Sequence, residues 1–298
     1  MKRRDTVFAL PALVAALIDG FRASLRDLGY IEGRTISIEI LSAEGNAERL
    51  PELAAQLAAR KVDIIITGGG NVSTLAARKA TTTIPIVMMS SISAVEAGLV
   101  QSLARPGGNV TGLTVPQELG FKQIQLLQEL APSLQRVAIL VRHDPAMTEI
   151  WEKAKSAAQQ MLLVQLSFFE VRSPDALARA LEAIRAAKPD AMIVSADPLL
   201  YQQREQILRF TRAARIPDMH FAPDMVDDGG LVAYSPALQD IYRGVARFVD
   251  RLLKGAKPAD LPVEQPTRFE LVINLKTARS LGLTIPQSVL LRAERVIE

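Results

Sequence analysis

The chain has 298 residues, a formal net charge of +3 at pH 7 and no cysteine. This length suits two domains or one large α/β domain, and the 49% hydrophobic content supplies apolar side chains for real cores. Lys and Arg are scattered among Asp and Glu, which argues against a nucleic-acid partner. Without cysteine there is no disulfide, thiol nucleophile or thiolate metal site, and the redox compartment stays open.

The N-terminus supports two interpretations. Residues 1–20, MKRRDTVFALPALVAALIDG, begin with basic residues and continue as an apolar run, as an export signal does. The run leads directly into FRASLRDLGY, in which Phe21, Leu25 and Leu28 share one helical face, so no polar mature start follows. No other segment reaches the roughly 18 apolar residues that a membrane span needs.

Strands and helices then alternate in short units, which predicts a parallel sheet with right-handed crossovers. After the first helix, the apolar patterns predict strands at 36–40, 63–67 and 84–89 and helices at 46–62, 73–81 and 94–104.

The same alternation begins again after residue 112. It predicts helices at 121–130, 150–161, 175–187 and 201–214, strands at 136–141, 165–171 and 191–196, and extended pieces at 218–222 and 229–235. A late helix at 237–253 precedes a strand at 263–274 and a short helix that ends at Gly282. We expect this late helix to pack against the first half, so that the chain crosses between the halves more than once.

The segment TGGGNVST, residues 67–74, is the first candidate for ligand binding. It follows a buried strand and opens a helix, a geometry that presents backbone N–H groups to an anion. The Lys-Ser/Thr pair of a P-loop is missing, and Ser73 stands where the dinucleotide fingerprint needs its third glycine. A small carboxylate is therefore favoured over a nucleotide, and the alternative is a tight turn with an ordinary Ser or Thr cap.

Other polar residues also follow predicted strands. His143, with Asp144 beside it, and His220 are interpreted as polar loop residues that contact a ligand, because no nucleophile elbow or metal-ligand spacing accompanies them. Asp197 and Tyr201 either line a cleft or belong to an Asp-Pro turn. We expect no catalytic residue, no metal and no cofactor.

Several segments resemble the family of ABC-transporter substrate-binding proteins that includes tryptophan- and tyrosine-type binding proteins. The most specific are SLARPGGNVTG and LPVEQPTRFELVINLKTA, and the similarity runs from Phe21 to the C-terminus. The resemblance implies an α/β type I periplasmic-binding-protein fold, in which two Rossmann-like lobes with parallel sheets are joined by three crossovers. The implied lobes are residues 1–111 with 236–261 and residues 112–235 with 262–298.

The resemblance also implies a hinge and a ligand site. We expect hinge residues at Gly107, Gly108, Tyr234 and Pro262. The ligand-binding residues would be Thr67, Gly68, Gly69, Asn71, Ser73, Thr74, Ser90, Ser91, His143, Asp144, Asp197, Tyr201, Phe221 and Asp224. Two features depart from the family: Ser93 and Ala94 replace its usual Asp-Pro pair, and the first strand is either shortened to Thr6–Leu10 or missing.

The expected function is that of the solute-binding component of an ABC importer. Such a protein closes on a small ligand, here an amino acid or similar carboxylate, and delivers it to a membrane permease and its ATPase. We expect a periplasmic monomer, or one anchored at the outer face of the inner membrane, that contacts the membrane complex only peripherally. If the N-terminal run is not a signal, the alternative is a cytoplasmic ligand sensor or regulatory module, and an enzyme is the third choice.

Overall fold

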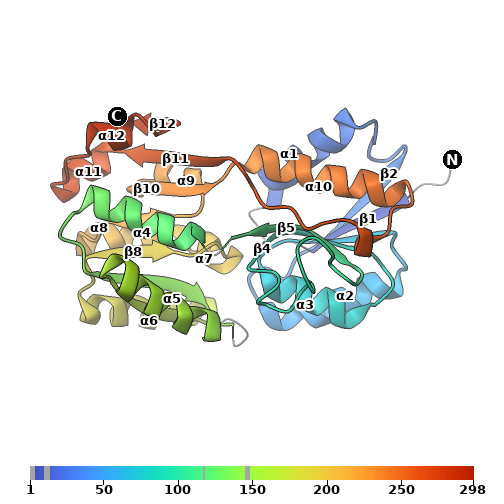
Figure 1. Ribbon diagram of the computed structural model, residues 1–298, viewed down its shortest axis with the longest axis horizontal. Helices are drawn as coiled ribbons and strands as arrows, with labels where there is room; N and C mark the ends of the chain where they lie inside the picture. Colours follow the sequence, from blue (N-terminus) through green and yellow to red (C-terminus); the bar gives the residue numbers. More distant parts are fainter. Residues whose placement is uncertain (1–3, 10–13, 117, 145–147) are drawn as a thin grey trace. The chain divides into compact units, whose positions relative to one another are not determined.

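Apolar strands alternate with amphipathic helices along the chain, and in the computed structural model this pattern builds two α/β units (Figure 1). The structure describes residues 4–9, 14–116, 118–144 and 148–298. The first unit comprises residues 1–116 and 236–268, and the second comprises residues 117–235 and 269–298. The chain therefore passes from one unit to the other three times, as the resemblance implies, and the predicted fold class is confirmed.

The first unit contains a five-stranded sheet in the order β2-β1-β3-β4-β5, with every adjacent pair parallel. β1 pairs with both β2 and β3, so the first strand is not missing; Leu10, which the prediction included, lies outside the described residues. The strands are β1 (Arg4–Ala9), β2 (Ile36–Leu41), β3 (Ile64–Thr67), β4 (Ile86–Ile92) and β5 (Val110–Val115).

Helices cover both faces of this sheet. Successive strand residues point to opposite sides, so these apolar strands place apolar side chains on both faces. On one face Phe21 of α1 (Val14–Asp27) and Phe248 of α10 (Leu238–Leu253) pack with Ile64 and Ile66. On the other face Ile65 packs with residues of α2 (Leu50–Ala59) and α3 (Asn71–Ala80). Figure 1 shows the late helix α10 in orange among the blue elements of this unit. Two short 3-10 turns, Ala47–Arg49 and Pro258–Asp260, complete the unit.

The helix predicted at 94–104 does not form, and this segment consists of turns and bends. Gly98 has φ +66°, and the amides of both Leu99 and Val100 donate to the carbonyl of Ala94. A residue in the left-handed region interrupts a helix, so the apolar spacing of this segment serves packing rather than helix formation.

The second unit contains a seven-stranded sheet in the order β12-β11-β10-β9-β8-β6-β7. The pairs β12–β11, β10–β9, β9–β8, β8–β6 and β6–β7 are parallel. Ala237 N donates to Arg268 O and Asn274 N to Leu231 O, so β11 runs antiparallel to β10 and the sheet is not wholly parallel. The strands are β6 (Arg136–Arg142), β7 (Gln165–Val171), β8 (Ala191–Val194), β9 (Asp218–His220), β10 (Val232–Pro236), β11 (Phe269–Asn274) and β12 (Arg295–Ile297).

Two clusters of apolar side chains cover the faces of this second sheet. One includes residues of α4 (Glu118–Leu130), α5 (Thr148–Leu162), α11 (Leu275–Leu281) and α12 (Gln287–Leu290). The other includes residues of α6 (Pro174–Ala187), α7 (Pro198–Gln202), α8 (Arg204–Ala214) and α9 (Pro223–Asp227). The helix predicted at 201–214 is thus divided into α7 and α8.

The unit boundaries fall after residues 116, 235 and 268, whereas the sequence placed the first and third after 111 and 261. Both differences come from β5, which continues in the first sheet to Val115. The chain beyond Pro262 runs beside it, since Thr114 N donates to Glu264 O at 3.0 Å and Glu264 N to Gly112 O at 2.9 Å. None of the helices in the described part of the chain has the length and apolar character that crossing a bilayer requires.

Candidate functional site

The carboxyl edge of the first sheet carries the glycine loop that the sequence singled out. β3 ends at Thr67 and α3 begins at Asn71, and between them Gly69 and Gly70 have φ values of +84° and +88°, which favour glycine. Gly70 is the N-cap of α3, and no side chain caps the helix from that position. The helix N-terminus therefore opens on this edge without a side-chain cap from its N-cap residue, the arrangement that receives an anion.

The hydroxyl groups of this loop bond within the protein. Thr67 Oγ1 and Thr74 Oγ1 lie 2.8 Å apart, and both side chains are buried. Ser73 Oγ donates to Gly70 O at 2.9 Å. The structure thus brings Thr67, Ser73 and Thr74 together as supports of the loop.

The end of β4 lies next to the same loop. Asn71 Nδ2 donates to Ile92 O, and Ile92 N donates to Asn71 Oδ1, each at 2.9 Å. Ser91 is buried and donates to Leu113 O at 3.4 Å, whereas Ser90 is half-buried. Ser93, at the position of the family's usual Asp, has φ +48°. The side chains of Ser93 and Ala94 are both buried.

Two candidate ligand residues, His143 and Asp144, follow β6 at the carboxyl edge of the second sheet. His143 Nδ1 contacts Glu170 Oε2, and its backbone N donates to Val171 O at 3.0 Å, which extends the pairing with β7. Asp144 is half-buried. Residues 145–147, which the sequence placed in the same loop, lie outside the described residues.

Asp197 follows β8 and caps α7. Its Oδ1 accepts from Leu199 N at 2.7 Å and Leu200 N at 3.3 Å, and Arg142 Nη1 lies 3.5 Å away. Burial raises the pKa of the Asp197 carboxyl, although Arg142 and the two amides oppose this rise. The capping geometry agrees with the Asp-Pro turn interpretation. Sequence reasoning missed Arg142, although a cation that ends the apolar run RVAILV was a usable signal.

Tyr201, Phe221 and Asp224 meet at the same edge, where α7 and α9 begin. The Tyr201 hydroxyl donates to Asp224, and the Phe221 ring is tilted against the Tyr201 ring at 6.2 Å. Arg204 lies 4.7 Å above the Tyr201 ring and donates to Asp228 at 3.0 Å. Burial, with the hydrogen bond to Asp224, raises the pKa of Tyr201 to about 12. The arrangement presents an aromatic surface beside carboxylates.

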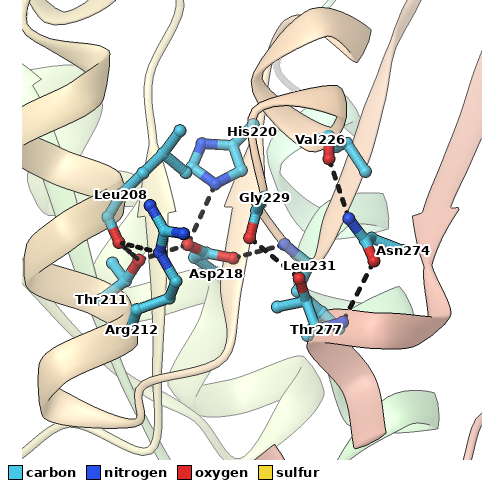
Figure 2. Close-up of polar contacts among 10 residues, drawn as sticks. All are labelled: Leu208, Thr211, Arg212, Asp218, His220, Val226, Gly229, Leu231, Asn274 and Thr277. Carbon is cyan, nitrogen blue, oxygen red and sulfur yellow. Dashed lines mark hydrogen bonds and ion pairs between the residues drawn. The ribbon is translucent and has the colours of Figure 1, made fainter. Parts of the chain in front are cut away.

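His220 is not a loop residue: it ends β9 and is fully buried, so the interpretation of this histidine as a ligand contact is wrong. Figure 2 shows its ring beside the buried carboxylate of Asp218, with Nε2 at 3.1 Å from Oδ2. Thr211 Oγ1 donates to the same oxygen at 2.6 Å, and Leu231 N donates to Oδ1 at 2.7 Å. Burial alone would raise the pKa of Asp218, but the His220 ring and these donors hold it below its usual value.

A second part of this buried network reaches the last helices. Asn274 Nδ2 donates to Val226 O and its Oδ1 accepts from Thr277 N, each at 3.0 Å. Thr277 Oγ1 donates to Gly229 O at 2.9 Å (Figure 2). The network joins α8, β9, α9, the loop before β10 and α11, and it stabilises the second unit.

The predicted hinge residues occupy different surroundings. Gly107 and Gly108 lie in the turn before β5, inside the first unit, and a Cβ on Gly107 would lie 2.3 Å from the Gln101 side chain. The segment RPGGNVTG is therefore a turn and a sheet strand, and the first passage between units comes after residue 116. Tyr234 stacks on Phe269 at 5.6 Å, next to the other two passages. Pro262 is exposed and lies within the first unit.

Two α/β units with largely parallel sheets, linked by three chain passages, define the class of type I periplasmic binding proteins. The chain is similar to the solved ABC domain in complex with L-Trp from Streptococcus pneumoniae, with 26% identity, a TM-score of 0.89 and 100% of each chain covered. It is also similar to the ligand-free, open structure of a substrate binding protein with adhesive properties from Clostridium difficile. That match has 20% identity and a TM-score of 0.69, and covers 100% of this chain and 99% of the other.

Residues 8–297 match the family described as ABC transporter substrate binding protein, and the chain belongs to this family. A curated relative, the tyrosine-binding protein of Clostridioides difficile (strain R20291), is 24% identical over 264 residues, which cover 89% of this chain and 76% of the relative. The resemblance seen in the sequence is thereby confirmed. In the part of the chain that the structure describes, no three His, Asp or Glu side chains gather as metal ligands would.

Proposed function

We propose that this protein binds an amino acid, or a similar small carboxylate, for an ABC importer and delivers it to the permease and its ATPase. Family membership supports the class of function. A tyrosine-binding relative and a similar solved structure in complex with L-Trp support an amino acid as the ligand. We further propose a periplasmic location and a monomeric state.

The observation that carries the proposal is the N-terminus of α3. Gly70 leaves the first turn of the helix without a side-chain cap, at the carboxyl edge of the sheet. The first residue of the helix, Asn71, is bonded to Ile92, two residues after half-buried Ser90. Backbone N–H groups and the positive end of the helix dipole stabilise a carboxylate at such a position. Ligands of parallel α/β sheets also bind at this edge.

The second unit, considered by itself, also contains candidate ligand contacts. Tyr201 and Phe221 offer aromatic surface, and Asp224 is an exposed carboxylate that suits an ammonium group. His143 and Asp144 remain proposed contacts on the neighbouring strand end. This combination fits an aromatic amino acid better than a simple organic acid, which has no ammonium group.

Isothermal titration with L-tryptophan, L-tyrosine and indole-3-propionate tests the ligand class. We expect both amino acids to bind and the propionate, which lacks the amine, to bind at least about tenfold more weakly, a difference of about 1.4 kcal/mol. Ser90→Asp places a like charge at the proposed carboxylate position and should abolish binding. Ser173→Asp, at an exposed position in the second unit, is the matched control and should bind as the wild type does. Equal binding by both variants would contradict the proposed carboxylate position.

Ligand-dependent closure is the proposed motion, and the three chain passages are its proposed hinge. Solution scattering with and without L-tryptophan should show a smaller radius of gyration in the bound state. Native mass spectrometry checks the monomeric state, and fractionation of cells with a tagged protein checks the periplasmic location.

A further inference from the structure

Strand β4 extends beyond its pairing with β3. The pairing runs from Ile65 with Ile86 to Thr67 with Met88, whereas β4 continues to Ile92. At this last residue the carboxamide of Asn71 pairs with both the N–H and the C=O of Ile92, each at 2.9 Å. The side chain of Asn71 therefore makes the two backbone hydrogen bonds that a neighbouring strand would make with Ile92.

The other side of β4 is held by β5. Met88 pairs with Gly112 and Ser91 with Thr114, so β4 has one extra residue in this interval, a β-bulge that includes Ser90. Thr114 Oγ1 donates to Ser91 O at 3.3 Å and accepts from Ala94 N at 3.1 Å. The end of β4 is thus fixed from both sides at Ser91, Ile92 and Ala94, directly after Ser90.

We propose that Asn71 is a positioning residue for ligand binding rather than a ligand contact. Its carboxamide fixes the Ser90 segment relative to the first turn of α3, so that both are in place before the ligand arrives. This inference rests on the proposed function, because it assumes that the ligand carboxylate is received at this edge. Preorganisation of this kind improves affinity by removing the cost of ordering the site on binding.

The chemistry of the pair explains why a carboxamide is needed. Asn71 is 6% exposed and acts as donor and acceptor at once. An aspartate would accept from Ile92 N but repel Ile92 O, and its charge would also oppose a ligand carboxylate. Asp in the first turn of a helix is otherwise favourable for stability.

Asn109 provides a matched control in the same unit. Its Nδ2 donates to Thr81 O at 3.0 Å and Ile84 O at 2.8 Å, so it also makes two bonds to backbone. These bonds lie before β4 and β5 begin, at the opposite edge of the sheet from Ser90. Asn109→Ala should reduce stability as Asn71→Ala does. It should not change the carboxyl edge of the sheet, where we propose that the ligand binds.

The test measures affinity for L-tryptophan and L-tyrosine by calorimetry, together with hydrogen exchange of the unliganded segment 89–93 and urea unfolding. We expect Asn71→Ala to lower affinity about tenfold and to speed exchange of 89–93, with a greater loss of affinity in Asn71→Asp despite better stability. Asn109→Ala should keep wild-type affinity. If wild type binds and Asn71→Ala binds equally well, or if both alanine variants lose affinity alike, the positioning role is refuted. If folded wild type binds neither amino acid, the proposed function fails, and the ligand role of Asn71 fails with it.

Discussion

Asp218→Asn is the sharpest test of how the second unit is stabilised. The substitution preserves size but removes the charge and one of two acceptor oxygens. In the structure Oδ2 accepts from Thr211 Oγ1 and lies 3.1 Å from His220 Nε2, while Oδ1 accepts from Leu231 N. An asparagine that keeps the bond to Leu231 must turn its amide N–H groups toward Thr211 and His220.

The size of the effect follows from these contacts. A hydrogen bond to a charged group contributes about 1.5–3 kcal/mol, and the buried Thr211 hydroxyl loses its charged acceptor in this variant. Asp218 is 2% exposed, so solvent cannot replace the lost partners. We expect the free energy of unfolding to fall by about 1.5–3 kcal/mol at pH 7, which with an m-value of about 2 kcal/mol/M lowers the urea midpoint by about 1 M.

Tryptophan fluorescence is the appropriate assay, because the chain has a single tryptophan, Trp151, in α5 of the second unit. Its ring stacks on Phe168 at 5.4 Å, so unfolding of this unit changes its surroundings. Thr211→Val removes one donor and should cost about 1 kcal/mol. Asp175→Asn, at an exposed site, should change stability by less than about 0.5 kcal/mol. A midpoint for Asp218→Asn no lower than that of Asp175→Asn would refute the reasoning.

The same substitution predicts a dependence on pH. Because the folded pKa of Asp218 lies below the unfolded value of about 3.9, its contribution is fully present above about pH 5. It is lost as the pH falls through the folded pKa. The difference in stability between wild type and Asp218→Asn should therefore narrow as the pH falls below about 5, and a difference that stays constant down to about pH 2 would contradict this assignment.

Three further predictions concern single positions. Thr67→Val should lower the thermal midpoint by removing the buried bond to Thr74, at a cost of about 1 kcal/mol, while calorimetric affinity for an amino acid stays unchanged. Gly112→Ala should prevent the first unit from folding, because the added Cβ would lie 2.3 Å from Met88 O and φ is +124°. Circular dichroism melts measure this loss. In an alkaline absorbance titration of the four tyrosines, Tyr201→Phe should remove the group that ionises near pH 12.

The alternation of strands and helices was predictable because it depends on local periodicity. The runs that became β3 and β6 are continuously apolar, and α10 has an apolar face along its whole length. The helix expected at 94–104 failed for a different reason: its apolar residues do pack in a core, as Leu99 and Val100 show, but Gly98 turns the backbone. Spacing alone does not distinguish a packed loop from a helix.

The candidate site was predictable only in part. The uncapped start of α3 follows from the local order of strand, glycines and helix, which the sequence displays. The partners of Asn71 and Thr67 do not follow from it, because Ile92 meets Asn71 only when β4 is paired in the sheet. The extended piece at 218–222 was predicted, but the burial of His220 was missed because a strand of three residues is too short to show which side chains face the core.

The discontinuous first unit has a consequence for the nascent chain. Phe21 of α1 and Phe248 of α10 belong to one core, yet the ribosome makes residues 117–235 between them. At about 5–20 residues per second, this interval lasts about 6–24 s. Until α10 emerges, the part of this apolar face that α10 covers remains exposed, which favours the binding of chaperones to the half-made chain.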